Sequence, residues 1–264
     1  MTLVSHPILG SRIDCTSYRD ACDRIVHWAH DRRSCYVIAA NVHVVMTAYW
    51  QRPYQRIVNQ AALVTPDGMP LVLALRLLGQ RSQSRVYGPD LMLALCDRAA
   101  QEQLPIYLYG GTTETLQKLT TNLKLQFPTL PIAGTHAPPF RPLTELEEVQ
   151  DCDRIQAAGA AIVFVGLGCP KQEQWMARQV DRLPAVMIGV GAAFSFHSGE
   201  VSQAPRWMMA MSLEWIYRLW AEPQRLWKRY LINNPAFLFL LTVQLFHTYS
   251  RLLSRFFKRF LTKI

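Results

Sequence analysis

Residues 160–175, AAIVFVGLGCPKQEQW, contain the pattern that decides the fold. Six apolar residues come first, Gly166, Gly168 and Pro170 follow, and a polar helical pattern begins at Lys171. A short apolar run that ends in glycine and precedes a helix-length segment is typical of a buried parallel strand and its crossover helix. The segment therefore predicts one β–α unit of an α/β sheet.

The same alternation recurs through the first 205 residues. Apolar runs at 35–40, 62–65, 106–109, 160–165 and 185–190, with a weaker one near Ile132, predict strands. Helical patterns occupy 42–60, 70–78, 89–102, 112–127, 145–158 and 171–182. This order indicates a Rossmann-like, doubly wound and mostly parallel sheet with helices on both faces. Such sheets bind ligands at the carboxyl ends of their strands, so the residues after each strand form the candidate site.

Glycines stand at several of these strand ends. Gly110-Gly111-Thr112-Thr113 offers backbone N–H groups and capping hydroxyls that can hold a phosphate or a ribose, although a plain tight turn uses the same residues. Gly166-x-Gly168 and Gly189-x-Gly191 are similar. Neither completes the dinucleotide pattern G-x-G-x-x-G, and the chain has no P-loop. The glycines favour a nucleotide site without identifying it.

Asp67 is the candidate catalytic residue. It lies in Pro66-Asp67-Gly68-Met69-Pro70, directly after an expected strand, where a stiff turn points a carboxylate towards the crevice. Such a carboxylate can act as a general base on an acceptor hydroxyl. Pro-Asp-Gly is also common turn chemistry, so an Asx-turn role is the alternative. Asp90 has its own structural alternative, as a first-turn carboxylate stabilised by a helix N-terminus.

Lys171, Gln172 and Glu173 begin a helix at the mouth of a strand, where polar side chains can grip a sugar or a base. His43 and His197 are lone imidazoles with no matching cysteine or aspartate spacing, so no metal site is expected. The six cysteines are scattered, which predicts free cytosolic thiols.

The net charge of +9 is concentrated at the C-terminal end of the chain. Residues 206–264 carry 10 Lys and Arg residues, and their only acids are Glu214 and Glu222. Four tryptophans, at 207, 215, 220 and 227, crowd the first half of this segment. Its partner should be anionic, and Asn233-Asn234-Pro235 predicts a break in its helical pattern.

Residues 236–264 predict an amphipathic helix. Polar positions such as Gln244 and His247 recur at helical spacing, and the opposite face carries Leu245, Tyr249, Leu252, Phe256 and Phe260. The most apolar run, 236–246, has 11 residues, whereas a membrane span needs ~20. The pattern indicates a helix that lies on an anionic membrane surface, because a continuous apolar face suits lipid better than nucleic acid.

We therefore expect a Rossmann-like core at 1–205, a basic Trp-rich appendage at 206–235 that closes the active site, and a membrane-surface helix at 236–264. No secretory signal follows Met1, which predicts a cytoplasmic protein, peripheral on the inner face of the cell membrane. No nucleic-acid partner is expected. The sequence leaves the oligomeric state open, and a homo-oligomer is compatible with it.

These segments, in this order, resemble the WecG/TagA/CpsF glycosyltransferases, glycosyltransferase family 26. The resemblance covers residues 36–237 and includes Asn41, the strand-end segments above and Arg85-x-x-Gly88-x-Asp90-Leu91. Its later parts are Ala204-Pro205-x-Trp207, Leu213-Glu214-Trp215-x-Tyr217-Arg218-Leu219, Glu222-Pro223-x-Arg225 and Arg229-Tyr230.

The resemblance implies an inverting transfer that uses neither a metal nor another cofactor. The donor it implies is UDP-activated N-acetylmannosamine or a related sugar, and the acceptor is a sugar on undecaprenyl diphosphate, a polyprenyl carrier. Without a metal, helix N-termini and arginines must meet the charge that develops on UDP. Ala39, Ser195 and Gln203 depart from the family pattern, which leaves the exact donor sugar open.

The resemblance also assigns roles to residues. It implies that Asp67 is the base, that Asn41 and Gln172 contact substrate, and that a basic group near the C-terminus closes over the diphosphate. The substrate-binding residues we expect are Asn41, Gly68, Arg85, Asp90, Gly110, Gly111, Gly166, Gly168, Lys171, Gln172, Glu173, Arg218, Arg225, Lys228 and Arg229.

Two other classes of protein compete with this interpretation. A nicotinamide-dependent oxidoreductase would need a full G-x-G-x-x-G after the first strand and an acidic residue about 20 positions further on, and this chain has neither. A non-enzymatic protein of the membrane surface would explain the basic tail but would leave the strand-end segments without a role.

Overall fold

The computed structural model describes residues 3–261, without the side chains of Ala210 and of 251–261. Its centre is a sheet of six strands in the order β4-β3-β8-β7-β5-β6, and every neighbouring pair is parallel. The strands are β3 (Cys35–Ala40), β4 (Leu63–Pro66), β5 (Ile106–Gly110), β6 (Ile132–His136), β7 (Ile162–Gly166) and β8 (Val186–Gly189). Each expected strand is present to within two residues, and the Rossmann-like fold class is confirmed.

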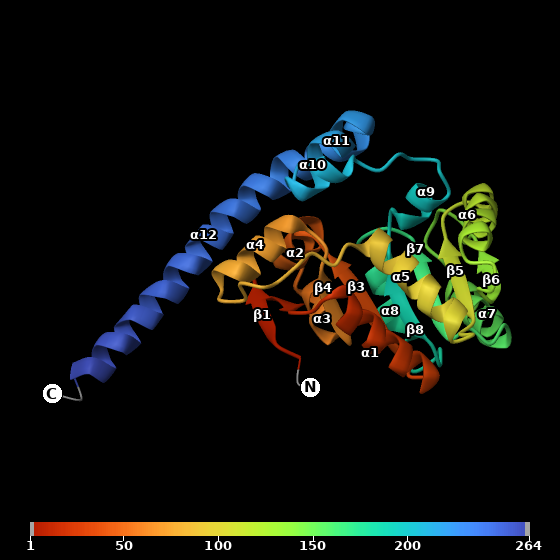
Figure 1. Cartoon of the computed structure of the whole chain (residues 1–264), viewed down its shortest axis with the longest axis horizontal. Coiled ribbons are helices and arrows are strands. Elements are labelled where there is room, and N and C mark those ends of the chain that lie inside the picture. The colour runs from red at the N-terminus through yellow and green to blue at the C-terminus, as the bar shows by residue number, and fades with distance from the viewer. Residues whose placement is uncertain (1–2, 262–264) are drawn as a thin grey trace.

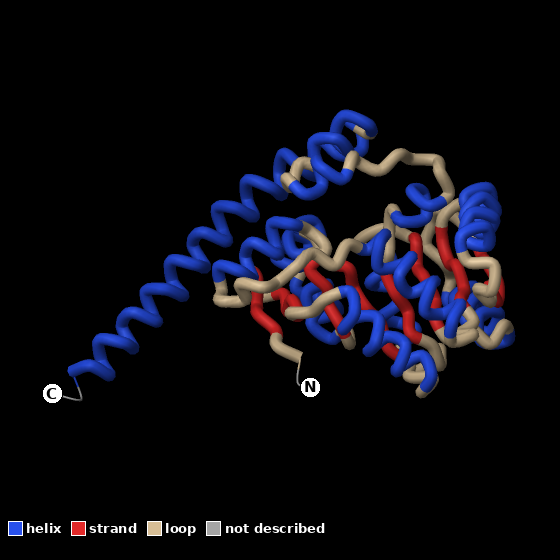
Figure 2. Tube along the Cα trace, viewed as in Figure 1, coloured by secondary structure: helices blue, strands red, loops and turns tan. Residues whose placement is uncertain are grey.

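Helices cover both faces of the sheet (Figures 1 and 2). One hydrophobic cluster joins the sheet to α1 (Tyr18–His30), α5 (Gly88–Gln101), α6 (Thr113–Gln126) and α9 (Ala193–His197). The other joins its opposite face to α2 (Val42–Trp50), α3 (Arg52–Gln60), α4 (Met69–Leu77), α7 (Glu145–Ala157) and α8 (Lys171–Gln179). Side chains of β3 alternate between the two clusters, as a strand buried on both faces requires.

Two parts of the core differ from the sequence pattern. The expected helix at 42–60 is divided into α2 and α3, because Gln51 is extended and Pro53, which has no N–H to donate, lies in the first turn of α3. Before the first expected strand, β1 (Ser5–Ile8) and β2 (Ser11–Asp14) form an antiparallel hairpin that the sequence pattern does not predict.

The C-terminal segment is helical and crosses the carboxyl edge of the sheet. After an irregular connection from α9, the chain forms α10 (Arg206–Ala210), α11 (Glu214–Ala221) and α12 (Pro223–Leu261) (Figure 1). Because α12 continues past residue 235, we call all three helices together the appendage from here on. The predicted break at Asn233-Asn234-Pro235 is wrong, because α12 runs through Pro235. No helix within residues 3–261 is long and apolar enough to cross a membrane.

Packing against the core explains why α12 tolerates its proline. A proline inside a helix costs ~3 kcal/mol, but Phe237 and Leu241 follow it and are buried in the core cluster of the α2 face. Gln244 adds two hydrogen bonds to the hairpin turn: its Oε1 accepts from Leu9 N at 2.8 Å, and its Nε2 donates to Pro7 O at 2.7 Å. Tertiary contacts thus outweigh the local preference.

The same contacts correct the expected faces of this helix. Gln244, expected on the polar face, points to the core. Leu245, expected on the apolar face, packs against the core cluster, and the Tyr249 hydroxyl donates to the Leu77 carbonyl. The side chains of Leu252, Phe256 and Phe260 lie outside the described residues. Phe239 and Phe246, which are exposed, lie opposite the buried Phe237 and Leu241 on α12.

Candidate active site

The carboxyl ends of β3, β4, β7 and β8 open into a cleft that the appendage covers. A larger compartment of about 420 Å³ lies over β7 and β8 and includes Gly111, after β5, in its lining. A smaller compartment of about 110 Å³ lies over the ends of β3 and β4. The residues that border both compartments are Asn41, Asp67, Tyr87, Arg218 and Arg229.

Asp67 follows β4 directly and lies where the compartments meet. Its N–H donates to Ala40 O at 2.8 Å, which ties the turn to the neighbouring strand β3. Its side chain is 13% exposed. Burial raises the pKa of Asp67 to about 6, against the lowering effect of the Arg85 guanidinium. A carboxylate with such a pKa is ionised at neutral pH and is a stronger base than an ordinary aspartate.

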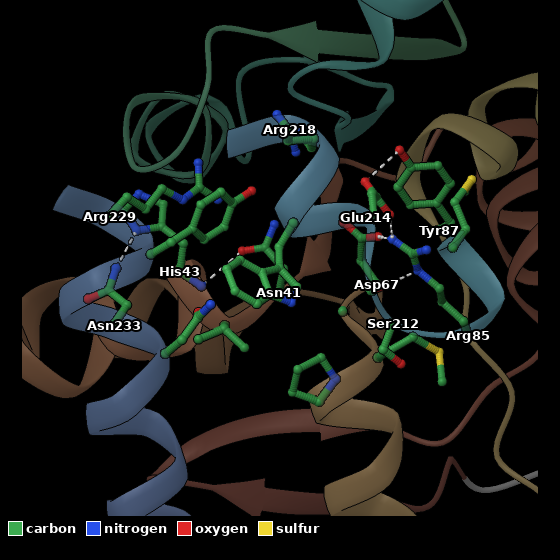
Figure 3. A pocket seen from close by; sticks show the side chains of 18 residues that line it. Asn41, His43, Asp67, Arg85, Tyr87, Ser212, Glu214, Arg218, Arg229 and Asn233 are labelled. Carbon is green, nitrogen blue, oxygen red and sulfur yellow. Dashed lines mark hydrogen bonds and ion pairs between the residues drawn. The ribbon is translucent and has the colours of Figure 1, made fainter. Parts of the chain in front are cut away.

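A second carboxylate, Glu214 of α11, reaches the same place from the appendage (Figure 3). Its Oε2 accepts from Arg85 Nη2 at 2.6 Å, and its Oε1 accepts from the Tyr87 hydroxyl at 3.0 Å. The Arg85 guanidinium lies 4.0 Å from the centre of the Tyr87 ring. Asp67, Arg85, Tyr87 and Glu214 therefore form one connected group.

Asn41 and His43 lie beside this group at the end of β3. Asn41 caps α2, because its Oδ1 accepts from His43 N at 3.0 Å and from Val44 N at 3.3 Å. Burial lowers the pKa of His43 to about 4, so its imidazole is neutral. His43 Nδ1 accepts from Asn233 Nδ2 of α12 at 3.1 Å, which pins the appendage to the core (Figure 3).

Close backbone packing explains some of the strand-end glycines. Gly110 has a φ of +118°, and a Cβ there would come within 2.7 Å of the Gly166 carbonyl carbon. A Cβ on Gly166 would come within 2.6 Å of the Phe194 ring. Gly110 is thus required by the packing of β5 against β7, whereas Gly111, Gly166 and Gly168 also line the larger compartment.

The helix after β7 contributes one side chain to the cleft. Gln172 lines the larger compartment, with its Oε1 accepting from Gly168 N at 3.1 Å and its Nε2 donating to Glu173 Oε1 at 2.8 Å. Glu173 is fully buried behind it, and burial raises its pKa. Lys171 lines a neighbouring cavity of about 360 Å³ instead of the cleft. Glu173 thus holds Gln172 in place rather than facing a ligand.

The appendage supplies the positive charge. Arg218 and Arg229 line both compartments, and the Nε of each is buried with no hydrogen-bond partner among the described residues. Arg225 lines the larger compartment and pairs with Glu222. Lys228 lines neither and lies over the Trp227 ring. Guanidinium groups at a cavity are suited to a phosphate or diphosphate group.

Of the remaining residues that the sequence predicts to bind substrate, some line the cleft and others do not. Arg85 and Gly68 line the smaller compartment, whereas Asp90 lines neither. Asp90 lies in the first turn of α5 and accepts from the Tyr18 hydroxyl at 3.5 Å. No group of three or more His, Cys, Asp or Glu residues that could hold a metal ion occurs in the described part of the chain.

Sequence reasoning missed two members of the site, Tyr87 and Glu214. Both lie inside segments on which the family resemblance rests, but neither is among the site residues that the sequence predicts. A signal for Glu214 was available, because it is one of only two acids in the strongly basic residues 206–264.

A parallel α/β sheet whose carboxyl edge holds a basic carboxylate, a glycine-lined compartment and arginines is suited to bind a nucleotide-activated substrate and to act on it. Residues 6–251 match the model of the glycosyl transferase WecG/TagA/CpsF family. The chain belongs to this family, as its strand-end segments indicated.

Two curated relatives agree. The chain is 32% identical over 200 residues to the N-acetylglucosaminyldiphosphoundecaprenol N-acetyl-beta-D-mannosaminyltransferase of Bacillus spizizenii strain W23. The matched region covers 75% of this chain and 76% of the relative. The chain is 30% identical over 231 residues to the enzyme of the same name from Bacillus subtilis strain 168, covering 87% of this chain and 86% of the relative. The glycosyltransferase class is confirmed, and the oxidoreductase and the non-enzymatic alternative are not supported.

Proposed function

We propose that this enzyme transfers N-acetylmannosamine from UDP to N-acetylglucosamine carried on undecaprenyl diphosphate, with inversion and without a metal. The names of the two relatives support this donor sugar and this acceptor. The position of Asp67, between two compartments and close to several arginines, is the observation that carries the proposal.

The two compartments suit the two substrates. The UDP-sugar occupies the larger one, where backbone groups of the glycine turns and the N-terminus of α6, capped by Thr112, face its phosphates. The acceptor sugar occupies the smaller one, beside Asn41 and Arg85. Asp67 then stands between the acceptor hydroxyl and the donor carbon, as a general base requires.

The reaction follows from this placement. Asp67 takes the proton of the acceptor hydroxyl while the hydroxyl oxygen attacks C1 of the donor sugar. A new C–O glycosidic bond forms as the bond from C1 to UDP breaks, and the electron pair of that bond passes to the β-phosphate. Arg218 and Arg229 meet the charge that develops there, in place of a metal ion.

The appendage also brings the cleft to the lipid carrier. Trp220, Phe239 and Phe246 are 80%, 68% and 69% exposed, on the side of the appendage that does not contact the core. Aromatic and basic side chains together favour the anionic inner face of a cell membrane. We therefore place the enzyme peripherally on that face, with the smaller compartment towards the lipid diphosphate.

A transfer assay tests the proposal. The full chain is incubated with UDP-N-acetylmannosamine, UDP-N-acetylglucosamine or UDP-glucose and a short-chain polyprenyl-diphosphate N-acetylglucosamine, and UDP release and the product anomer are measured. We expect turnover to be fastest with the first donor, and NMR to show a β-linked product from the α-linked donor. A product that retains the α configuration, or no transfer from any donor, would refute the proposal.

A further inference from the structure

Glu214 is an acid in a segment whose other charges are almost all positive. The other acid of that segment, Glu222, pairs with Arg225 of the neighbouring turn. Among the ion pairs of the described residues, none joins Glu214 to an arginine of its own helix. Its side chain instead reaches the core and is 13% exposed there. Its partner Arg85 lies 129 positions away in the sequence.

Arg85 is shared unequally between two carboxylates. Its Nη2 lies 2.6 Å from Glu214 Oε2 but 3.5 Å from Asp67 Oδ1. Its Nε donates to the backbone carbonyl of Asp67, and the ring of Tyr87 covers its face. Nη2 carries two N–H groups and could donate to both carboxylates, but these contacts hold the guanidinium close to Glu214 and leave only a long, weak bond for the Asp67 side chain (Figure 3).

We propose that Glu214 is a positioning residue that makes the basicity of Asp67 depend on docking of the appendage. When α11 is docked, Glu214 takes the strong hydrogen bond of Arg85, and the Asp67 carboxylate is left able to accept a proton. When α11 is undocked, Arg85 turns fully to Asp67 and holds it as an ion pair. The inference rests on the proposed function, since it assumes that Asp67 is the base.

This coupling has a functional consequence. The appendage carries Arg218 and Arg229, so the same docking that activates the base also brings the charges that meet the leaving diphosphate. With the appendage undocked, both the base and the stabilising charges are lost together. The arrangement protects a bound sugar nucleotide from attack by water until the cleft has closed.

The charges around Asp67 determine in which direction its pKa moves when the Glu214 contact is lost. The titratable or charged side chains that face Asp67 or line the smaller compartment with it are Tyr18, His43, Arg85, Tyr87, Glu214, Arg218, Arg229 and Tyr230. Burial and Glu214 raise the pKa of Asp67, whereas Arg85 and Arg218 lower it. Loss of the Glu214 contact therefore lets Arg85 lower the pKa of Asp67 further.

The test is the pH dependence of kcat/KM for Glu214→Gln and Glu214→Asp. Gln removes the charge. Asp keeps the charge, but its side chain is one methylene shorter and cannot keep the 2.6 Å contact with Arg85. We expect both variants to move the acid limb of the profile down by about one pH unit, the usual size of such a neighbouring-charge effect. Turnover on the plateau should fall at least several-fold, because the base is weaker.

Two further variants serve as controls. Tyr87→Phe removes one hydrogen bond of Glu214 but keeps the Arg85 pair and the covering ring, so its acid limb should stay in place. Glu102→Gln breaks a comparable ion pair with Arg98, which does not line the cleft, and should leave the whole profile unchanged. Thermal melting checks that all four variants are folded.

The outcomes separate this inference from the proposed function. An acid limb that stays in place in Glu214→Asp, in a parent enzyme that transfers sugar, overturns the inference alone. A shift in Tyr87→Phe as large as in Glu214→Gln also overturns it, because that shift would not require the Arg85 contact. A parent enzyme that shows no transfer instead contradicts the proposed function.

Discussion

The two walls of the active-site cleft are built in different ways. The sheet wall presents backbone groups and short side chains that follow fully buried strands, so their positions are fixed by the core. The appendage wall presents long charged side chains on helices. Near the cleft, two contacts tie this wall to the core: Glu214 Oε2 accepts from Arg85 Nη2 at 2.6 Å, and Asn233 Nδ2 donates to His43 Nδ1 at 3.1 Å. Further along α12, the buried Phe237 side chain adds a third contact.

This difference indicates a division of labour. The sheet wall carries the proposed base, Asp67, which needs accurate placement because a general base acts only within hydrogen-bond reach of its proton. The appendage wall carries charge, which acts over a longer range and tolerates movement. Substitution of Asp67 should therefore affect the chemical step alone. Substitutions of the appendage arginines should weaken donor binding, and substitutions on the exposed face of α12 should weaken membrane attachment; Glu214, which acts on Asp67 through Arg85, is the exception on the appendage wall.

The largest effect is expected from Asp67→Asn. The amide cannot accept the proton, so turnover should fall about 100-fold or more. The Kd for UDP should be nearly unchanged, because the lost role is exerted in the transition state. Asp97→Asn, on the exposed side of α5, is the matched control and should retain full turnover. Turnover of Asp67→Asn within threefold of the parent would exclude Asp67 as the base.

A smaller effect, on affinity, is expected from Arg229→Gln. Hydrogen bonds to charged groups contribute about 1.5–3 kcal/mol, so UDP should bind roughly tenfold or more weakly, as calorimetry can measure. The neighbouring Lys228→Gln removes the same charge from a side chain that does not line the cleft and should bind UDP like the parent. Equal losses in both variants would mean that net charge, and not the placement of Arg229, governs binding.

The pH profile of the parent should show the raised pKa of Asp67. The base works only when deprotonated, so kcat/KM should be constant above about pH 7 and should fall as the pH drops through the pKa of about 6. About tenfold of activity should be lost between pH 7 and pH 5, since each unit below a pKa removes about nine-tenths of the base. A profile that stays flat down to pH 5 would show that the pKa of the catalytic group is not raised.

A modest effect is expected from the exposed face of α12. Truncation would open the core, since Phe237 and Leu241 are buried, so point substitutions are the cleaner test. The double variant Phe239→Ser/Phe246→Ser should bind anionic liposomes at least several-fold more weakly, because rings that enter only the interface give a fraction of the about 1.5–3 kcal/mol that full burial of each would give. His247→Ser on the same helix should bind nearly as the parent does. Unchanged flotation of the double variant would place the membrane contact elsewhere.

Sequence reasoning succeeded where local pattern and tertiary structure agree. The apolar runs that precede Asn41, Asp67 and Gly111 are strands, because a buried parallel strand is apolar on both faces. It failed at Pro235, where the local rule predicts a break but the packing of Phe237 outweighs it.

The contacts between the two walls could not be predicted for a different reason. Glu214 meets Arg85 only after the irregular connection between α9 and α10 has crossed the sheet edge, and that connection has no hydrophobic periodicity to read. The residues Glu173 and Lys171 show the same limit, since both are polar and follow a strand. Glu173 is buried behind Gln172, whereas Lys171 lines a neighbouring cavity.

No effect at all is expected from chelation. Arg218 and Arg229 line both compartments from the appendage wall, and in the proposed mechanism their charge takes the place of a metal ion. One Asp-x-Asp sequence, Asp151-Cys152-Asp153, does occur. It lies within α7 and lines neither compartment, and Asp151 there accepts from the Tyr109 hydroxyl at 2.7 Å.

Turnover measured in excess EDTA should therefore equal turnover in untreated enzyme, and added Mg²⁺ or Mn²⁺ should not increase it. The Arg229→Gln variant sharpens the experiment. If arginine charge replaces a metal ion, this variant should lose affinity for UDP equally with and without Mg²⁺. If chelation instead abolishes turnover in the parent and Mg²⁺ restores it, the leaving diphosphate is neutralised by a metal ion, and the role given to the appendage wall is wrong.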